Sequence, residues 1–312
     1  MKRGFDLKCF ENSLKEILCC PDCKSDLQIE DDNKLLCCKC GNGFDINDGI
    51  IVLMPQNGNQ AQNEERELRE KVAEEHGSQD IEKIYKAIEK HHCMPLMSSK
   101  AEAFRNQFNN NQWIVDVGCG SGYYWQKSDS GAKLILMDFA MSNLKAARNI
   151  LKDSNNVLFV QADASCLPFK NNAVSGIWSV QVTQHFPETV MTNFLNELQR
   201  VLQIKHVIEI YNLNPDFMHK VIYRLFGKYF HIKGQYGEML QNKLHGKELL
   251  FLWEMFTRDG KTKIEYSELF FHPNFKLFPQ FNAIVYIEKI LNLMPFFTKL
   301  FARQISINIS KM

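Results

Sequence analysis

Residues 113–122 read WIVDVGCGSG, an apolar run that contains one acid and continues into three glycines at alternate positions. A short apolar run bounded by turn-forming residues is typical of a buried strand. Glycine allows the backbone to turn sharply and to approach a ligand without an intervening side chain. The stretch therefore predicts a buried strand that ends in a ligand-binding loop made by Gly118, Gly120 and Gly122.

Downstream of this loop, strand-like and helix-like segments alternate. Alternation of this kind indicates parallel strands joined by right-handed crossover helices. We therefore expect an α/β, Rossmann-like, doubly wound and mostly parallel sheet of seven strands, in which the final segment QISINIS (304–310), with its period of two, is the antiparallel last strand. The strand-like runs are KLILMD (133–138), VLFVQAD (157–163), VSGIWSV (174–180) and KHVIEIYN (205–212), and the helix-like segments between them include MSNLKAARNILKD (141–153) and PETVMTNFLNELQRVL (187–202).

Two acids that close the next strands favour a cofactor containing a nucleoside. Asp138 lies twenty residues after Gly118, where a carboxylate can accept hydrogen bonds from both hydroxyls of a ribose. Asp163 closes the third strand, where a carboxylate can accept from an adenine amino group. The simpler interpretation is that the glycines only turn a strand into a helix and that the acids cap helices.

Spacing and charge separate two kinds of adenosine cofactor. The dinucleotide fingerprint G-x-G-x-x-G would require glycine at position 123, where the chain has Tyr123. Asp116 would repel a pyrophosphate, whereas it would attract the positive amino group and sulfonium of S-adenosylmethionine. The sequence therefore favours the cationic cofactor.

On these motifs the chain resembles the class I S-adenosylmethionine-dependent methyltransferases, in their ubiquinone/menaquinone-type branch. The resemblance covers roughly residues 113–212, and it includes DVGCGSG (116–122), DASCLPF (163–169) and IWSVQVTQH (177–185). One departure is that the chain lacks the Pro-Gly-Gly-like turn that usually follows the fourth helix of the family. The resemblance implies a set of cofactor-binding residues, in which the first four surround the methionine part, the fifth binds the ribose and the last two bind the adenine: Asp116, Gly118, Gly120, Gly122, Asp138, Asp163 and Ala164.

Aromatic and titratable residues near these motifs are further candidates. Phe139 is a candidate to lie against the adenine face, although it could equally be a core aromatic. His185 follows the fourth strand, at the edge of the sheet where substrates bind, and its imidazole could act as a general base. A loop histidine that only shapes the pocket is the alternative. Tyr123, Tyr124 and Trp125 could line the acceptor pocket, but core packing is the more frequent use of such residues.

Four of the ten cysteines predict a structural zinc site near the amino terminus. Cys20 and Cys23 form one C-x-x-C pair, and Cys37 and Cys40 form a second pair after thirteen intervening residues. Two such hairpins can place four thiolates tetrahedrally around one zinc ion. Residues 14–54 resemble the small zinc-binding activator subunit of transfer-RNA and protein methyltransferases, and similar ribbons are fused to ribosomal-RNA guanine methyltransferases. We expect the site to be structural, because four thiolates leave no open coordination position.

These patterns divide the chain into three parts. We expect a zinc-ribbon domain at 1–57, a linker with helices that cap the cofactor site at 58–108, and a class I methyltransferase domain at 109–312 with a specificity insertion at about 211–300. The chain has no apparent signal peptide and no apolar run of the length that spans a membrane, so we expect a cytoplasmic protein.

The distribution of charge along the chain favours some classes of methyl acceptor over others. The net charge of the 312 residues is +1, and residues 1–58 carry seven Lys and Arg against ten Asp and Glu, which disfavours nucleic acid as a partner. Residues 211–312 carry fourteen basic against eight acidic residues, and the segment IVYIEKILNLMPFFTKLFAR (284–303) allows a hypothesis of contact with the inner membrane face. An ordinary core-facing helix is the alternative. We expect a small-molecule or lipid- or glycan-linked acceptor; methylation of ribosomal or transfer RNA, or a non-catalytic scaffold, are the alternatives. No protein partner is predicted.

Overall fold

The computed structural model describes most of the two predicted domains and little of the linker and the insertion. The residues described are 11, 15–31, 33–56, 67, 70–71, 94–126, 128, 131–152, 154, 156–183, 186, 188–213, 261–267, 290–291, 293–302 and 304–311.

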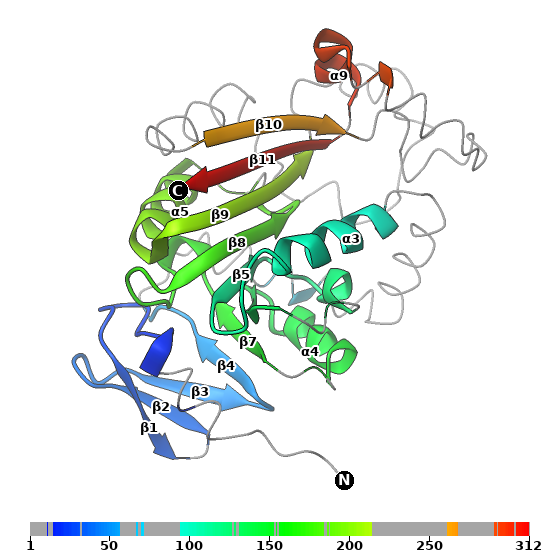
Figure 1. The fold of residues 1–312 in the computed structure, drawn as a ribbon. Coiled ribbons are helices and arrows are strands. Elements are labelled where there is room, and N and C mark those ends of the chain that lie inside the picture. Colours follow the sequence, from blue (N-terminus) through cyan, green and yellow to red (C-terminus); the bar gives the residue numbers. More distant parts are fainter. Residues whose placement is uncertain are drawn as a thin grey trace.

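Five parallel strands form the centre of the sheet (Figure 1). They lie in the order β7-β6-β5-β8-β9, so β5, the first of these five along the chain, lies in their middle and the later strands are added outward in both directions. Their bounds are β5 Trp113–Val117, β6 Lys133–Asp138, β7 Val157–Ala162, β8 Val174–Val180 and β9 Leu202–Leu213. The carboxyl ends of all five strands therefore meet at one edge, which we call the site edge.

Two antiparallel strands complete this half of the sheet. β11 (Gln304–Lys311) pairs with β9 in antiparallel register, which confirms the expectation for the last strand. β10 (Lys261–Ser267) pairs with the outer side of β11 and was not predicted. Its sequence KTKIEYS is charged, because a strand at the edge of a sheet needs no continuous apolar run.

The cysteine module, residues 15–56, is not separate from the sheet, which corrects the expectation of a seven-stranded sheet beside a detached ribbon. Its strands β1 (Leu27–Asp31), β2 (Lys34–Cys37), β3 (Gly43–Asn47) and β4 (Ile50–Leu53) are paired in chain order, and β4 pairs in parallel with β7. The result is one mixed sheet of eleven described strands (Figure 1). The module covers the backbone edge of β7, which would otherwise be an unpaired edge.

Helices cover both faces of the sheet. α3 (Met94–Arg105) and α4 (Met141–Ile150) pack on one face, and α5 (Glu188–Val201) packs on the other. Successive residues of the central strands alternate between the two faces: Ile114 belongs to the core cluster on the α3/α4 face and Val115 to the cluster on the α5 face. All five residues of β5 are buried, because both of its faces are covered.

Two further findings concern the helices: one explains why the chain lacks a Pro-Gly-Gly-like turn, and the other bears on the hypothesis of membrane contact. α5 ends at Val201 and β9 begins at Leu202, so the chain needs no Pro-Gly-Gly-like turn at this position. Among the described residues, no helix combines the length and the apolar character that crossing a membrane requires.

Candidate cofactor site and cysteine cluster

The glycine loop leaves the carboxyl end of β5 at the site edge, and its three alternate glycines all have left-handed φ angles: +74° at Gly118, +54° at Gly120 and +66° at Gly122. Side chains rarely adopt this conformation, so glycine is the favoured residue at each position. The loop continues into a 3-10 turn, Tyr123–Trp125, at the place where the sequence indicated that the strand turns into a helix.

The space around the three glycines differs. A Cβ atom at Gly118 would lie 2.3 Å from Val182 Cγ2, and one at Gly122 would lie 3.1 Å from Leu136 Cδ1, so both positions are closely packed by the protein itself. A Cβ atom at Gly120 would meet none of the described residues within 4 Å. Gly120 therefore borders open space, as a cofactor cradle requires.

Ser121 also fits a site that binds a ligand. Its side chain is buried, and among the described residues its hydroxyl oxygen has no hydrogen-bond partner. Buried polar groups are normally satisfied, so an unsatisfied hydroxyl beside open space at Gly120 is consistent with a partner that the cofactor would supply.

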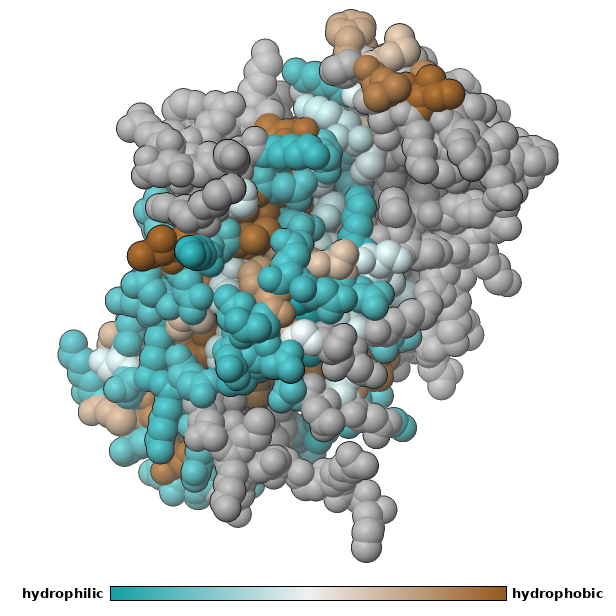
Figure 2. Space-filling model, viewed as in Figure 1, coloured by the Kyte–Doolittle hydropathy of each residue, from teal (hydrophilic) through white to brown (hydrophobic). Residues whose placement is uncertain are grey.

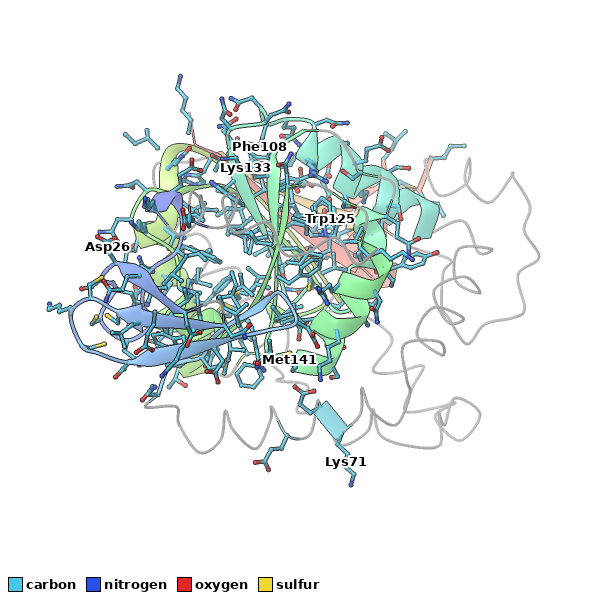
Figure 3. All side chains as sticks on the ribbon, turned by 90° about the horizontal axis from the view of Figure 1, so that it is seen from below. Asp26, Lys71, Phe108, Trp125, Lys133 and Met141 are labelled. Carbon is cyan, nitrogen blue, oxygen red and sulfur yellow. The ribbon has the colours of Figure 1, made fainter. Side chains whose placement is uncertain are left out.

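Asp116 is almost fully buried, and its Oδ2 accepts a 2.7 Å hydrogen bond from Trp125 Nε1. Burial raises the pKa of this carboxyl to about 7, the hydrogen bond from Trp125 opposes the rise, and the nearby charge of Asp138 adds to it. A positive group bound beside Asp116 would favour its ionised form. Trp125, labelled in Figure 3, is thus a core residue that also orients Asp116, a role that the sequence alone did not indicate.

Asp138 joins the loop to the helix that follows β6. Its Oδ2 accepts from the backbone N–H of Gly120 at 2.9 Å, and its Oδ1 accepts from the backbone N–H of Ala140 at 2.9 Å and from Asn143 Nδ2 at 3.2 Å. The carboxylate of Asp138 therefore holds the Gly120 cradle in place from the neighbouring strand. The structure brings Asp116, Gly120 and Asp138 together at the site edge, as the sequence predicted.

Asp163, the third acid predicted to contact the cofactor, also stabilises the local structure. Asp163 is buried and caps the 3-10 turn η2 (Ala164–Cys166), because its Oδ1 accepts from both the backbone N–H and the hydroxyl of Ser165 at 2.7 Å. Capping was the simpler interpretation of this acid. Ala164 and Phe139 are half-buried, and the carbonyl of Phe139 accepts from Gln161 Nε2 at 3.0 Å.

The structure describes only some of the residues near the carboxyl ends of β8 and β9, where an acceptor would bind. His185, the candidate base, lies outside the described residues. Asn212, near the end of β9, is buried and donates a 2.7 Å hydrogen bond to Thr183 Oγ1, while its own Oδ1 has no partner in the part of the chain that the structure describes. These two buried polar residues, one after β8 and one near the carboxyl end of β9, were not predicted as site residues, since single Asn and Thr residues carry no spacing signal.

Glu70, in the segment predicted to cap the cofactor site, was also missed. Its carboxylate accepts from the backbone N–H of Met141 and, at 3.1 Å and 2.6 Å, from the backbone N–H and the hydroxyl of Ser142. It thereby caps the amino terminus of α4, next to Asp138. Figure 3 shows Lys71, the neighbour of Glu70, close to Met141.

The four predicted metal ligands lie together in the cysteine module. The Sγ atoms of Cys20, Cys23, Cys37 and Cys40 are all within 4.8 Å of one another, with 3.7 Å between Cys20 and Cys40 and 3.3 Å between Cys23 and Cys37. A tetrahedral zinc ion with Zn–S bonds of 2.3 Å has sulfur atoms about 3.8 Å apart, so the cluster fits this ion. Hydrogen bonds from Ser25 lower the pKa of Cys23 to about 6, whereas burial raises the pKa of Cys20 and the pKa of Cys40 is also raised, so the thiols of the cluster do not all favour the thiolate in the absence of a metal.

The first cysteine hairpin contacts the loop that carries the predicted adenine-binding residues. Lys24 Nζ donates to the carbonyl of Leu167 at 3.2 Å and pairs with Glu197 of α5 at 2.9 Å, and the thiol of Cys166 donates to the carbonyl of Pro21 at 2.7 Å. The backbone N–H of Cys19 donates to the carbonyl of Pro168 at 2.9 Å. The first cysteine hairpin is thus joined by direct hydrogen bonds to residues 166–168, at the end of η2 and just after it.

Comparison with protein families gives one match at the expected place. Residues 114–205 match the family model described as "Methyltransferase domain". An uncharacterized chloroplastic methyltransferase of Arabidopsis thaliana is 30% identical over 99 residues, which is 29% of this chain and 28% of that protein. The chain thus matches less than a third of the length of this curated relative.

Solved structures with a similar fold include several methyltransferases. Geranyl diphosphate C-methyltransferase from Streptomyces coelicolor is 13% identical, with a TM-score of 0.48 over 71% of this chain and 77% of that one. A SAM-dependent methyltransferase from Archaeoglobus fulgidus is 17% identical, with a TM-score of 0.46 over 70% and 94%. A chain of the complex between the Haloferax volcanii Trm112 methyltransferase activator and a putative methyltransferase is 14% identical, with a TM-score of 0.48 over 73% and 93%.

The order of the central strands, the glycine loop with its acids and the family match agree on the same part of the chain. Residues 114–205 therefore resemble a methyltransferase domain, and they contain the glycine loop and the central parallel strands.

Proposed function

We propose that this chain transfers the methyl group of S-adenosylmethionine to a small-molecule or lipid-linked acceptor. The observation that carries the proposal is the cradle at Gly120, which is open to a ligand and is fixed by Asp138, beside the buried carboxylate of Asp116. When bound, the cofactor supplies a methyl group on a positively charged sulfur, which an acceptor nucleophile displaces. The protein then has to position the acceptor and exclude water.

Different residues at the site edge bind different parts of the cofactor in this proposal. In the proposal, Asp116 faces the positive part of the cofactor, Asp138 accepts from the ribose while it holds Gly120, and Asp163 with Ala164 borders the adenine. Ser121 offers its unsatisfied hydroxyl to the bound molecule. Four cysteine thiolates hold a zinc ion that stabilises the cysteine module and takes no part in the chemistry.

Isothermal titration of the full chain with S-adenosylhomocysteine tests the cofactor site. One molecule should bind per chain, and Asp138→Asn should weaken binding about tenfold, as expected when a charged hydrogen bond is lost. A flat titration of the wild-type protein would contradict the proposal and would favour a scaffold that only retains the fold.

Transfer of a labelled methyl group tests the acceptor class. The protein is incubated with labelled S-adenosylmethionine and with the organic-soluble, aqueous small-molecule and RNA fractions of a cell extract. Label is expected in the first or second fraction. Label in the RNA fraction alone would replace the proposed acceptor with RNA.

A further inference from the structure

The segment before β11 exposes a cluster of large apolar side chains, which we call the α9 patch. α9 (Pro295–Phe301) is preceded by a turn, and Phe296 and Leu293 are 81% and 80% exposed. Ile290 and Met294 are also more than half exposed. Figure 2 shows the patch as a brown area at the α9 end of the molecule. At these four positions the segment faces solvent, whereas the alternative interpretation of the sequence was a core-facing helix and turn.

The position of the patch follows from the strand pairing. Gln304, at the beginning of β11, pairs with Leu213, at the end of β9, so the segment before Gln304 lies at the site edge. Three strand spacings, from β11 through β9 and β8, separate this position from β5 and its glycine loop. At about 4.8 Å per spacing, the base of α9 lies about 14 Å along the edge from the loop.

Charge distinguishes a membrane surface from other partners. The sequence from 290 to 303 contains Lys299 and Arg303 and no acidic residue, and Lys299 is exposed. The region 211–312 as a whole carries fourteen basic against eight acidic residues. Exposed apolar side chains next to basic ones are typical of segments that lie in the interface of an anionic bilayer.

The other face of α9 holds it on the domain. Thr298 is buried, and the backbone N–H of Ala302, itself buried, closes the helix by donating to the carbonyl of Thr298 at 2.8 Å. The helix therefore has one face toward the protein and one toward solvent. Its seven residues are too few to span a bilayer, so any contact of α9 with a membrane would be at the interface.

We propose that the α9 patch docks the protein on an anionic membrane surface and brings the site edge to the bilayer, so that the acceptor is lipid-linked. This inference rests on the proposed methyltransferase function and narrows its acceptor class. The apolar side chains enter the boundary between headgroups and acyl chains while Lys299 stays at the level of the headgroup phosphates. A lipid headgroup could then reach the site edge without leaving the membrane.

Vesicle flotation of the full chain tests the docking. The wild-type protein should float with vesicles of phosphatidylcholine and phosphatidylglycerol and much less with phosphatidylcholine alone. The double variant Leu293→Asp/Phe296→Asp should bind at least about tenfold more weakly, because burial of each side chain is lost. Ile204→Asp is the matched control, since Ile204 is 74% exposed near the amino end of β9, at the opposite edge of the sheet. This variant should float as the wild type does.

The results separate docking from the cofactor site. Titration of each variant with S-adenosylhomocysteine should give the wild-type affinity, because the patch lies outside the cradle. A wild-type protein that binds S-adenosylhomocysteine but does not float would overturn the docking and leave the proposed function standing. Loss of a dimer in the double variant, seen by gel filtration, together with absent flotation, would show that a second copy covers the patch and would also overturn it. Equal flotation of the double variant and the wild type would also overturn the proposed docking.

Discussion

The glycines of the loop have the same backbone conformation but different surroundings, so equal substitutions should have unequal effects. Gly118→Ala places a Cβ atom against Val182 in addition to the left-handed strain, and we expect a loss of about 2–4 kcal/mol in the free energy of unfolding. Gly120→Ala meets only open space and should lose about 1 kcal/mol.

The binding effects of these two variants complete the comparison. The new methyl group of Gly120→Ala occupies the cradle, so affinity for S-adenosylhomocysteine should fall about tenfold while the fold is kept. Urea unfolding and calorimetric titration measure the two quantities. If Gly120→Ala binds as the wild type does, the open space beside Gly120 is not the cofactor cradle.

The raised pKa of Asp116 predicts opposite pH effects on the free and the bound protein. Because burial raises its pKa from 3.8 to about 7, the native state binds the proton more tightly than the unfolded state. Its contribution to the stability of the free protein is therefore complete below about pH 4 and is lost as the pH rises through 7. The amino group of the ligand favours the carboxylate, so affinity should increase from pH 6 to pH 8.

Thermal unfolding with and without S-adenosylhomocysteine at pH 6 and pH 8 measures both effects. The upward shift of the midpoint caused by the ligand should be larger at pH 8 in the wild type. In Asp116→Asn it should be smaller and the same at both pH values, since the amide does not titrate. A shift that grows equally with pH in this variant would mean that another group is responsible.

Between elements, the contacts of Lys24 join the first cysteine hairpin to α5 and to the end of the loop after β7. The side chain of Lys24 is 27% exposed and that of its partner Glu197 is 13% exposed, whereas Lys34 and Glu30 form a pair in which both side chains are more than 40% exposed. Lys24→Met should therefore cost about 1–2 kcal/mol in the free energy of unfolding, and Lys34→Met less than about 0.5.

The affinity for S-adenosylhomocysteine tests whether Lys24 also positions the loop that follows β7. If Lys24 holds the loop that begins at Asp163, Lys24→Met should also weaken binding of S-adenosylhomocysteine several-fold, with restoration by Lys24→Arg. Equal affinities of Lys24→Met and Lys34→Met would restrict Lys24 to a contribution to stability.

The observed strands and helices show which elements the sequence patterns could predict and which they could not. The buried strands β5 to β8 and the helices α4 and α5 were predicted, because their apolar periods are strong and local. β10 was missed, since an edge strand can be charged. The segment after Gly122 is a 3-10 turn, and its last residue, Trp125, donates to Asp116, a contact that the sequence did not indicate.

At the scale of the whole molecule, the continuous sheet predicts that the cysteine module and the rest of the sheet unfold together. β4 and β7 share a parallel ladder, and Leu18 forms a bridge with Phe169. Removal of zinc from the full chain by a chelator should therefore lower the single thermal transition of the entire protein by about 5 °C or more. Differential scanning calorimetry of the metal-loaded and chelated protein measures this shift. Two transitions, with the larger one unchanged, would show that the module is energetically independent.

The sequence by itself determined the α/β class, the ligand loop, the acids at the strand ends and the spacing of the four cysteines. Each of these signals lies within one segment, where periodicity or spacing expresses local geometry. The tertiary structure decided which side chains meet across the sheet: Trp125 on Asp116, Asp138 on Gly120, Glu70 on α4, and β4 on β7. The exposure of the α9 patch also depends on the fold, because an apolar segment becomes a surface only when no other element packs against it.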